Sequence, residues 1–569
     1  MIFLLPIKDI SDERKIRFVE IVKKEPVIAN IAQLLLFIAM EFDGSNAYLE
    51  YYYTIPALML LFLSGVLLIS DLKIDNKVAY YLAISELFVV PVLYFVITRN
   101  VVFLILYIPL LIGFYYKLLK KVTLILFFGI SLLFLPDRTF FGTDEILIGY
   151  YSAYLFIHHL NPYNYSLTSN VYSFYNLTYA KYLIGTPYTT GGFVTNLNYP
   201  SLFFLIEIPT VILNISPNYE ILIFYLLTGV LMYLNTNELT FLLFISIYLL
   251  NYNYLFYPLG GVDDIIWVFF VLLSMTVKNA RLKGVLYGLA ISYKQDPLII
   301  LPFYLLHLGK ERIKFLWFTG FTFLLINAYF IYLSPFLFLN DLLTPLKGGL
   351  IQIGYGIDVI SITGLYYLYP AFFIIASILI LIVGLLTNKR WYGVVYLSFL
   401  FFHRVLWNYL MYWPLFSYVD SFQNNKLLLV NPKKVRRSLF ALIILILLIL
   451  GVYFHLNFLN YQNSIHMKVI KVFEKDDYIF AFLINVSFYG EGSALPHFRI
   501  LQDSPTITAN GLLWCSNSTI LKTGGSEIVY VYAPYHFLYI NINNTKIIEI
   551  NAYYSNYQGY ELLNFKTCL

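Results

Sequence analysis

Long apolar runs recur along the chain from residue 27 to residue 456, separated by short polar segments. Many of these runs reach or approach the roughly 20 residues that an α-helix needs to cross a bilayer. Hydrophobic residues make up 60% of the 569 residues and charged residues only 12%, whereas a typical soluble domain is about 25% charged. The sequence therefore predicts a polytopic α-helical membrane protein with about 12–14 helices.

Lys and Arg cluster in some of the polar segments and are scarce in others. The segment before the first apolar run carries Lys8, Arg14, Lys15, Arg17, Lys23 and Lys24. Because short cytoplasmic loops carry an excess of Lys and Arg, we expect a multi-pass protein of the cell membrane with a cytoplasmic N-terminus. The same rule, applied to the later basic clusters, places the C-terminal region outside the cell.

The apolar runs and the basic clusters divide the chain into four parts. Residues 1–26 are predicted to be the cytoplasmic N-terminus, and residues 27–120 to hold the first transmembrane helices. Residues 121–456 would form the main transmembrane bundle, which contains an outside loop at 137–200. A loop of that length in a compact bundle is usually functional. Residues 460–569 would form a separate domain.

Apolar residues alternate with polar ones in the C-terminal part, as in 527–532 and 537–542. Alternation with a period of two is typical of half-buried strands, so we expect a small extracellular β-rich domain at 460–569. Both cysteines of the chain, Cys515 and Cys568, lie in this domain. They form either a disulfide, which an extracellular location permits, or two free thiols.

Two adjacent carboxylates, Asp144 and Glu145, follow the fifth apolar run. Residues 146–160 then repeat apolar and aromatic positions at helical spacing, and Asn161-Pro162 ends the pattern because proline disfavours helix in the residue before it. The pattern predicts a surface helix that holds the carboxylates at the edge of the bundle. Asp144 would then be placed to act as a general base. Alternatively, the two acids only stabilise the helix N-terminus.

Arg404 lies between two apolar segments. A charge at membrane depth costs about 2.5–3.5 kcal/mol on insertion scales and is a functional candidate by default. Its guanidinium group matches the oxygen atoms of a phosphate. Alternatively, the side chain reaches toward lipid headgroups.

Lys294 separates two apolar segments, 284–293 and 297–308, which are each too short to cross a bilayer alone. A re-entrant pair of half-helices would bring Lys294 into a cavity, and an ion pair with Asp296 is the simpler alternative. Asp263 and Asp264 precede another apolar segment, where they either contact a substrate or cap a helix. No metal-ligand spacing and no glycine-rich phosphate loop occurs, so neither a metal nor a cofactor is expected.

In their order along the chain, these segments resemble the GT-C superfamily of membrane glycosyltransferases, in particular the polyprenyl-phosphate-mannose-dependent mannosyltransferases. The resembling segments are Asp144-Glu145, Asn161-Pro162-Tyr163, Tyr199-Pro200-Ser201-Leu202, Gly261-Val262-Asp263, Lys294-Gln295-Asp296-Pro297, and Arg404 with Asn408-Tyr409. The resemblance covers residues 120–420. The four helices expected at 27–116 are extra relative to that family, and the C-terminal domain also has no counterpart in it.

The resemblance implies a GT-C-like helical bundle and an inverting glycosyltransferase. Such an enzyme moves mannose or another hexose from a polyprenyl- or dolichyl-phosphate donor to a lipid-linked or glycan acceptor on the outer face of the membrane. Asp144 would be the catalytic base, and Arg404 and Lys294 would bind the donor phosphate. The acceptor or the sugar would be bound by Glu145, Asp263, Asp264, Asn408 and Tyr409. The other partners would be membrane lipids, and no nucleic acid is expected.

Two other functions remain open from the sequence. A lipid or glycan transporter, or flippase, predicts internal repeats and charged residues along a path through the membrane midplane. A noncatalytic membrane subunit whose C-terminal domain binds surface glycans predicts that Asp144 and Arg404 lie far apart.

Overall fold

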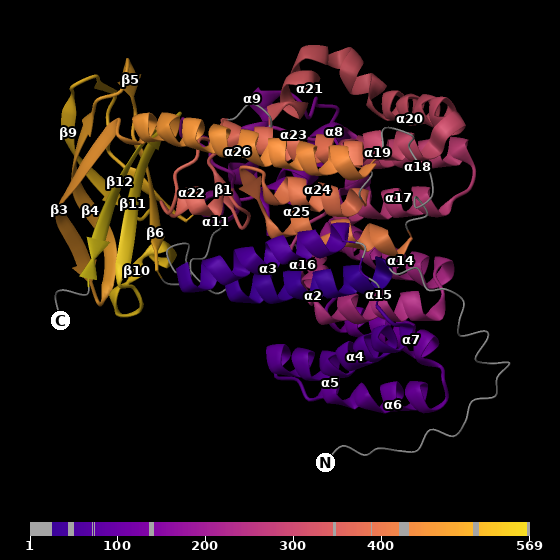
Figure 1. Ribbon diagram of the computed structural model, residues 1–569. Helices are drawn as coiled ribbons and strands as arrows, with labels where there is room; N and C mark the ends of the chain where they lie inside the picture. Colours follow the sequence, from indigo (N-terminus) through magenta and orange to yellow (C-terminus); the bar gives the residue numbers. More distant parts are fainter. Residues whose placement is uncertain are drawn as a thin grey trace.

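The structure, a computed structural model, describes residues 25–43, 51–70, 72, 74–135, 142–344, 349–387, 390–419, 432–503 and 511–565. Its N-terminal part is mostly helical up to Gln462, and an antiparallel sheet follows (Figure 1). Most helices run across the view in Figure 1, and the sheet, in yellow, stands at one end of them. The predicted combination of a helical part and a C-terminal β-rich domain is confirmed. Residues 1–24, predicted to be cytoplasmic, lie outside the described residues.

The first helices are α2 (Glu25–Asp43), α3 (Tyr51–Ile69), α4 (Asn76–Thr98), α5 (Val102–Ile105), α6 (Tyr107–Tyr115) and α7 (Leu119–Leu133). The helices within the 137–200 loop are α8 (Asp144–Ile157), α9 (Tyr165–Thr168), α10 (Val171–Phe174) and α11 (Lys181–Ile184), and α12 (Leu202–Ile206) and α13 (Ile208–Leu213) follow it. Then come α14 (Asn218–Asn235), α15 (Glu238–Leu250), α16 (Asn253–Leu259), α17 (Ile265–Thr276), α18 (Ala280–Tyr293), α19 (Leu301–Leu308) and α20 (Arg312–Leu333). The last are α21 (Pro335–Leu342), α22 (Val359–Ile362), α23 (Pro370–Thr387), α24 (Trp391–Leu400), α25 (Trp407–Met411) and α26 (Pro432–Gln462).

Four helical stretches of the described chain are long and apolar enough to cross a membrane, or five if the bent pair α15–α16 is one span. They are Tyr52–Ile69, Asn76–Thr98, Asp296–Leu333 and Ala441–Gln462, and the bent pair turns by 59°. Several long apolar helices indicate a multi-pass membrane protein. Two other apolar stretches are interrupted, because 102–115 is divided into α5 and α6, and 407–418 into α25 and the 3-10 helix Trp413–Tyr418.

Two glycines allow α18 to pack closely against α20. A Cβ atom on Gly284 would lie 2.5 Å from the carbonyl oxygen of Phe315, and one on Gly288 would lie 2.6 Å from Cβ of Thr322. Small residues four positions apart let helix backbones approach in this way. Because α18 ends at Tyr293, this packing fixes the point at which Lys294 leaves the helix.

The segment 297–308 was expected to be one half of a re-entrant pair of half-helices, but in the structure it is continuous with the helical elements that follow it. It begins in the 3-10 helix Asp296–Ile300 and continues through α19, a second 3-10 helix (Gly309–Glu311) and α20. Together these elements form the apolar stretch Asp296–Leu333.

The C-terminal sheet is antiparallel throughout and nearly closes into a barrel. Its strand order is β10-β4-β9-β7-β6-β11-β12, and β3 also pairs with β4. The strands are β3 (Ile465–Lys475), β4 (Tyr478–Phe488), β6 (His497–Gln502), β7 (Leu512–Ser516), β9 (Ser526–Tyr532), β10 (Ile540–Asn541), β11 (Ile547–Tyr554) and β12 (Tyr557–Asn564). The short strands β5 (Ser493–Ala494) and β8 (Leu521–Lys522) pair with each other, as do β1 (Ile353–Gly354) and β2 (Arg404–Val405) in the helical part.

Alternating apolar residues fill the interior of the sheet. Phe482 and Ile484 of β4 lie opposite Val531 and Val529 of β9, and all four side chains are fully buried. The alternation at 527–532 thus correctly predicted β9. The strand expected at 537–542 is wrong, because this segment contains the 3-10 helix His536–Leu538, the two-residue strand β10 and the start of another 3-10 helix, Ile542–Asn544.

A small hairpin at 186–194 joins the helical part to the sheet. Pro187 pairs with Phe193 across this hairpin. Its Thr189 accepts a hydrogen bond from the amide of Ser555 at 2.9 Å, and the ring of His497 lies 3.1 Å from the carbonyl oxygen of Thr190. The sheet is therefore anchored on the same loop that follows α8.

The two cysteines were expected to form a disulfide or to be free. Sγ of Cys515 lies 3.1 Å from the hydroxyl of Tyr182. Cys568 lies outside the described residues, so a disulfide between them stays a prediction.

Candidate functional site

Asp144 is the first residue of α8 but does not cap it. Thr143 is the N-cap, and its hydroxyl accepts a hydrogen bond from the amide of Ile146 at 3.3 Å. The carboxylate of Asp144 instead accepts a hydrogen bond from the amide of Thr186, with Oδ2 and N 2.8 Å apart. Asp144 is therefore not the N-cap residue, but it and Glu145 lie in the first turn of α8, where the alternative expected them to stabilise the helix N-terminus.

The helix that carries Asp144 is enclosed by the protein. Most of its residues are buried, from Ile146 through Ala153 and again at Leu155. It packs against α12 and α13, which follow the long loop. The predicted surface helix is thus a core helix. It also ends at Ile157, before Asn161-Pro162.

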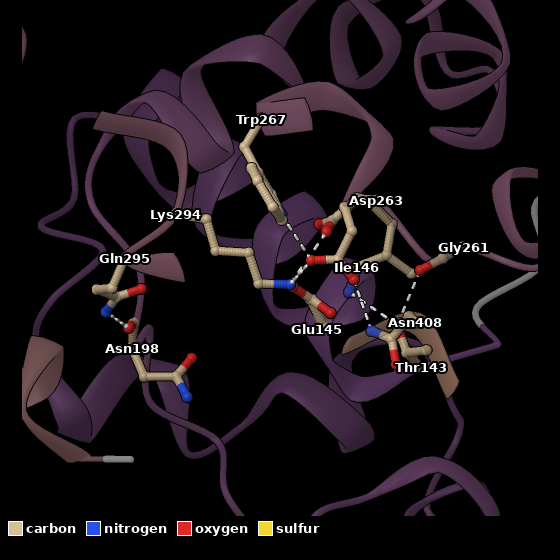
Figure 2. Close-up of polar contacts among 11 residues, drawn as sticks. Thr143, Glu145, Ile146, Asn198, Gly261, Asp263, Trp267, Lys294, Gln295 and Asn408 are labelled. Atoms are coloured by element: carbon tan, nitrogen blue, oxygen red, sulfur yellow. Dashed lines mark hydrogen bonds and ion pairs between the residues drawn. The ribbon is translucent and has the colours of Figure 1, made fainter. Parts of the chain in front are cut away.

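A buried ion cluster lies behind Asp144. Nζ of Lys294 is 2.5 Å from Oε1 of Glu145, 2.7 Å from Oδ1 of Asp264 and 3.7 Å from Oδ1 of Asp263 (Figure 2). The Lys294 side chain is 3% exposed. These contacts join α8, the turn before α17 and the end of α18. Asp296, the expected partner of Lys294, is not among its ion-pair partners in the described structure.

Asp264 is held by two further hydrogen bonds. Nε1 of Trp267 donates to Oδ1 at 2.8 Å, and Nδ2 of Asn408 donates to Oδ2 at 2.5 Å. Its side chain makes no capping hydrogen bond to α17. Asp264 thus occupies the N-cap position of α17, as the cap alternative expected, but its carboxylate links α17, α18 and α25 instead of capping the helix.

Asp263 has fewer partners than its neighbour. It is fully buried, and neither of its carboxylate oxygens accepts a hydrogen bond from the described residues. Oxygens of Glu145, Asp263 and Asp264 lie within 4.8 Å of one another, a spacing that could hold a metal ion. The ammonium group of Lys294 contacts all three carboxylates and supplies a positive charge to the same cluster.

A cavity of about 100 Å³ opens in front of the cluster. Asp144, Glu145, Arg404 and Tyr409 all line it. The Arg404 guanidinium donates a hydrogen bond to the carbonyl oxygen of Ile351, which fixes its orientation. Two carboxylates and a guanidinium group therefore border one space.

Asp144 titrates near neutral pH. Its enclosure by protein raises the pKa of the carboxyl group from 3.8 to about 6, and the adjacent Glu145 adds to this rise. The hydrogen bonds from Thr186 and the charge of Arg404 oppose it. A carboxylate with a pKa near 6 can accept a proton at neutral pH more readily than an ordinary aspartate can.

The structure brings together all eight residues that the sequence singled out. Asp144, Glu145, Arg404 and Tyr409 line the cavity, and Lys294, Asp263, Asp264 and Asn408 join Glu145 in the cluster behind it. The sequence did not predict the parts played by Thr186 and Tyr199. Thr186 acts through its backbone, which leaves no sequence signal, whereas Tyr199 belongs to the segment that resembles the glycosyltransferases. The Tyr199 ring lies 5.4 Å from Nζ of Lys294.

Comparison of the chain with models of protein families, with curated proteins and with solved structures finds no match. The function is therefore argued from the site itself.

Proposed function

We propose that the protein is a GT-C-type membrane glycosyltransferase that uses a polyprenyl- or dolichyl-phosphate sugar as its donor. The observation that carries this proposal is that Asp144 and Arg404, from segments 260 positions apart, line one cavity. Transfer of a sugar from a sugar phosphate requires a base for the acceptor hydroxyl and a cation for the leaving phosphate, both bordering the same cavity. In this proposal the N-terminus is cytoplasmic, and the cavity and the sheet lie on the outer side of the membrane.

The reaction is a single displacement. The oxygen of an acceptor hydroxyl attacks the anomeric carbon, and Asp144 takes up the hydroxyl proton. The bond between the anomeric carbon and the phosphate oxygen breaks, so that polyprenyl phosphate leaves and the configuration at the anomeric carbon is inverted. Arg404 stabilises the negative charge that grows on the phosphate.

The ion cluster stabilises the side of the cavity on which Asp144 lies. Glu145 belongs to both the cavity and the cluster, and its contact with Lys294 ties α8 to α18. Lys294 also offsets part of the negative charge of the three carboxylates behind the space that the donor phosphate would occupy. In this proposal Asp263, Asp264 and Asn408 position Lys294 and Glu145, and Tyr409 contacts the substrate.

The same geometry weighs against the two alternatives. A noncatalytic subunit gives no reason for Asp144 and Arg404 to meet at one cavity. A transporter or flippase requires charged residues along a path through the membrane, whereas the four acidic and basic residues of the ion cluster gather at one place.

The proposal is tested by sugar transfer in membranes from cells that express the chain. The donors are dolichyl-phosphate mannose and dolichyl-phosphate glucose, and the controls are the corresponding nucleotide sugars. We expect transfer from at least one lipid-linked donor and none from the nucleotide sugars, because no nucleotide-binding segment occurs in the sequence. Transfer from nucleotide sugars alone, or from none of the donors, contradicts the proposal.

The pH dependence of transfer provides a second prediction. Only the deprotonated form of Asp144 can act as a base, so the rate should fall as the pH drops through its pKa of about 6. The positive charge of Arg404 lowers this pKa, and the variant Arg404→Met should therefore move the midpoint to higher pH. Initial rates across the pH range measure the midpoint independently of the maximal rate. A midpoint near 4 in the wild type, or no shift in the variant, would speak against Asp144 as the base.

A further inference from the structure

A second cavity lies between the 186–194 hairpin and the sheet. It has a volume of about 330 Å³, and both the loop and the sheet contribute aromatic side chains to its lining. These include Tyr182, Phe193, Trp514, Tyr532 and Tyr553. We propose that this aromatic groove binds the glycan portion of the acceptor. The inference rests on the proposed transferase activity, and it names the class of molecule that the enzyme modifies.

Exposed aromatic rings extend from the groove toward solvent. The ring of Tyr182 lies 5.8 Å from that of Tyr535, which is in turn stacked on Phe537 at 5.5 Å with an angle of 6° between the planes. Tyr179 packs against both Tyr535 and Phe537. We call these four residues the aromatic platform. Tyr179, Tyr535 and Phe537 are 43%, 36% and 41% exposed, so a ligand can reach their rings.

The polar groups of the groove suit a neutral ligand that carries hydroxyl groups. Among the described residues that line the groove there is no Asp, Glu, Lys or Arg, whereas Ser516, Ser518 and His497 do line it. Burial lowers the pKa of His497, which keeps its ring neutral. Its Nε2 donates to the carbonyl oxygen of Thr190, and Nδ1 is therefore the nitrogen with a free lone pair.

Aromatic rings and hydroxyl groups together are the recognition elements that a sugar requires. The C–H face of a pyranose packs on an aromatic ring, while its hydroxyl groups bond to polar atoms at the edge. A phosphate or a nucleotide would need cationic partners in the groove. The ammonium group of Lys181, which does not line the groove, lies over the rings of Tyr182 and Phe193, at 5.3 and 5.9 Å from their centres.

The groove and the Asp144 cavity share one wall. Thr186 and Val194 line the Asp144 cavity, whereas their neighbours Pro187 and Phe193 line the groove. The amide of Val194 donates to the carbonyl oxygen of Thr186 at 2.7 Å, so the two sides of the hairpin that form the wall are hydrogen-bonded to each other. Figure 1 shows α11, which carries Tyr182, beside the sheet. A glycan in the groove therefore lies next to the base that would activate its hydroxyl group.

The test is binding of hexasaccharides to the purified full-length chain, measured by calorimetry and by ligand-detected NMR. The probes are mannohexaose, maltohexaose and chitohexaose, and no sugar donor is present. We expect at least one of them to bind, and the double variant Tyr535→Ala/Phe537→Ala to bind it about tenfold more weakly, because two stacking rings are lost. The matched control is Tyr489→Ala, which removes an exposed tyrosine of the same domain outside the platform and should leave binding unchanged.

Two outcomes overturn the inference. Either none of the three hexasaccharides binds the wild type, which is the result expected if the platform instead docks a protein, or the double variant binds as the wild type does. These outcomes can be distinguished from a failure of the proposed transferase activity. Binding without any sugar transfer contradicts the proposed activity and supports the glycan site. Transfer without binding contradicts the glycan site and supports the proposed activity.

Discussion

Replacing Asp144 by asparagine should slow sugar transfer by roughly 100- to 10,000-fold, the contribution usual for a general base. Asparagine has nearly the same shape but cannot take up the proton of an acceptor hydroxyl. Its amide oxygen can still accept the hydrogen bond from Thr186, which spans 2.8 Å in the wild type. The variant should therefore fold, and the initial rate of transfer per amount of protein measures the chemical effect.

The matched control for this experiment is Asp476→Asn, which makes the same exchange at an exposed turn between β3 and β4. It should transfer sugar at the wild-type rate. Equal rates for Asp144→Asn and the wild type would exclude Asp144 as the base. Glu145, which lines the same cavity, and Asp263 behind it would then be the next candidates.

Replacing Lys294 by methionine should destabilise the protein by about 3–5 kcal/mol, the usual cost of removing one partner from a buried ion pair. Methionine keeps much of the side-chain volume but leaves Glu145, Asp263 and Asp264 without their shared cation. Carboxylates buried together repel one another strongly when no positive charge is near. We expect a lower unfolding temperature of the purified protein and the loss of sugar transfer.

A second variant separates this charge effect from simple damage to packing. Adding Asp264→Asn and Glu145→Gln to Lys294→Met removes two of the unpaired charges, so part of the lost stability should return. Lys310→Met is the control, because Lys310 is exposed and no ion pair is found for it among the described residues. An unchanged unfolding temperature in Lys294→Met would show that the cluster does not stabilise the fold.

The grouping of the site residues could be predicted from the sequence. Charged residues at the ends of apolar segments are costly in a membrane protein unless they meet partners, and Glu145, Asp264 and Lys294 do meet. Arg404 was also expected to share a site with Asp144, and both line one cavity. The order of these segments along the chain was informative because each of them lies at the end of an apolar segment.

Other features could not be predicted because they depend on tertiary contacts. The hydrogen bond from Thr186 to Asp144 uses a backbone amide, which every residue except proline possesses. Helix α8 has the composition of an interfacial helix, and only the packing of α12 and α13 against it makes it a core helix. The alternation at 537–542 also resembles a strand, although only the two residues of β10 form one and three of the other four lie in 3-10 helices.

The connection between the helical part and the sheet leaves little room for a hinge. Helix α26 ends at Gln462 and β3 begins at Ile465, and the two residues between them are both hydrogen-bonded. Hinges are residues that can absorb large changes of backbone angle, and this joint is held by its own hydrogen bonds. The sheet therefore cannot swing freely as a lid. The 186–194 hairpin, which lines both the aromatic groove and the Asp144 cavity, is bonded to the sheet as well, so the sheet is attached to the helical part at two places.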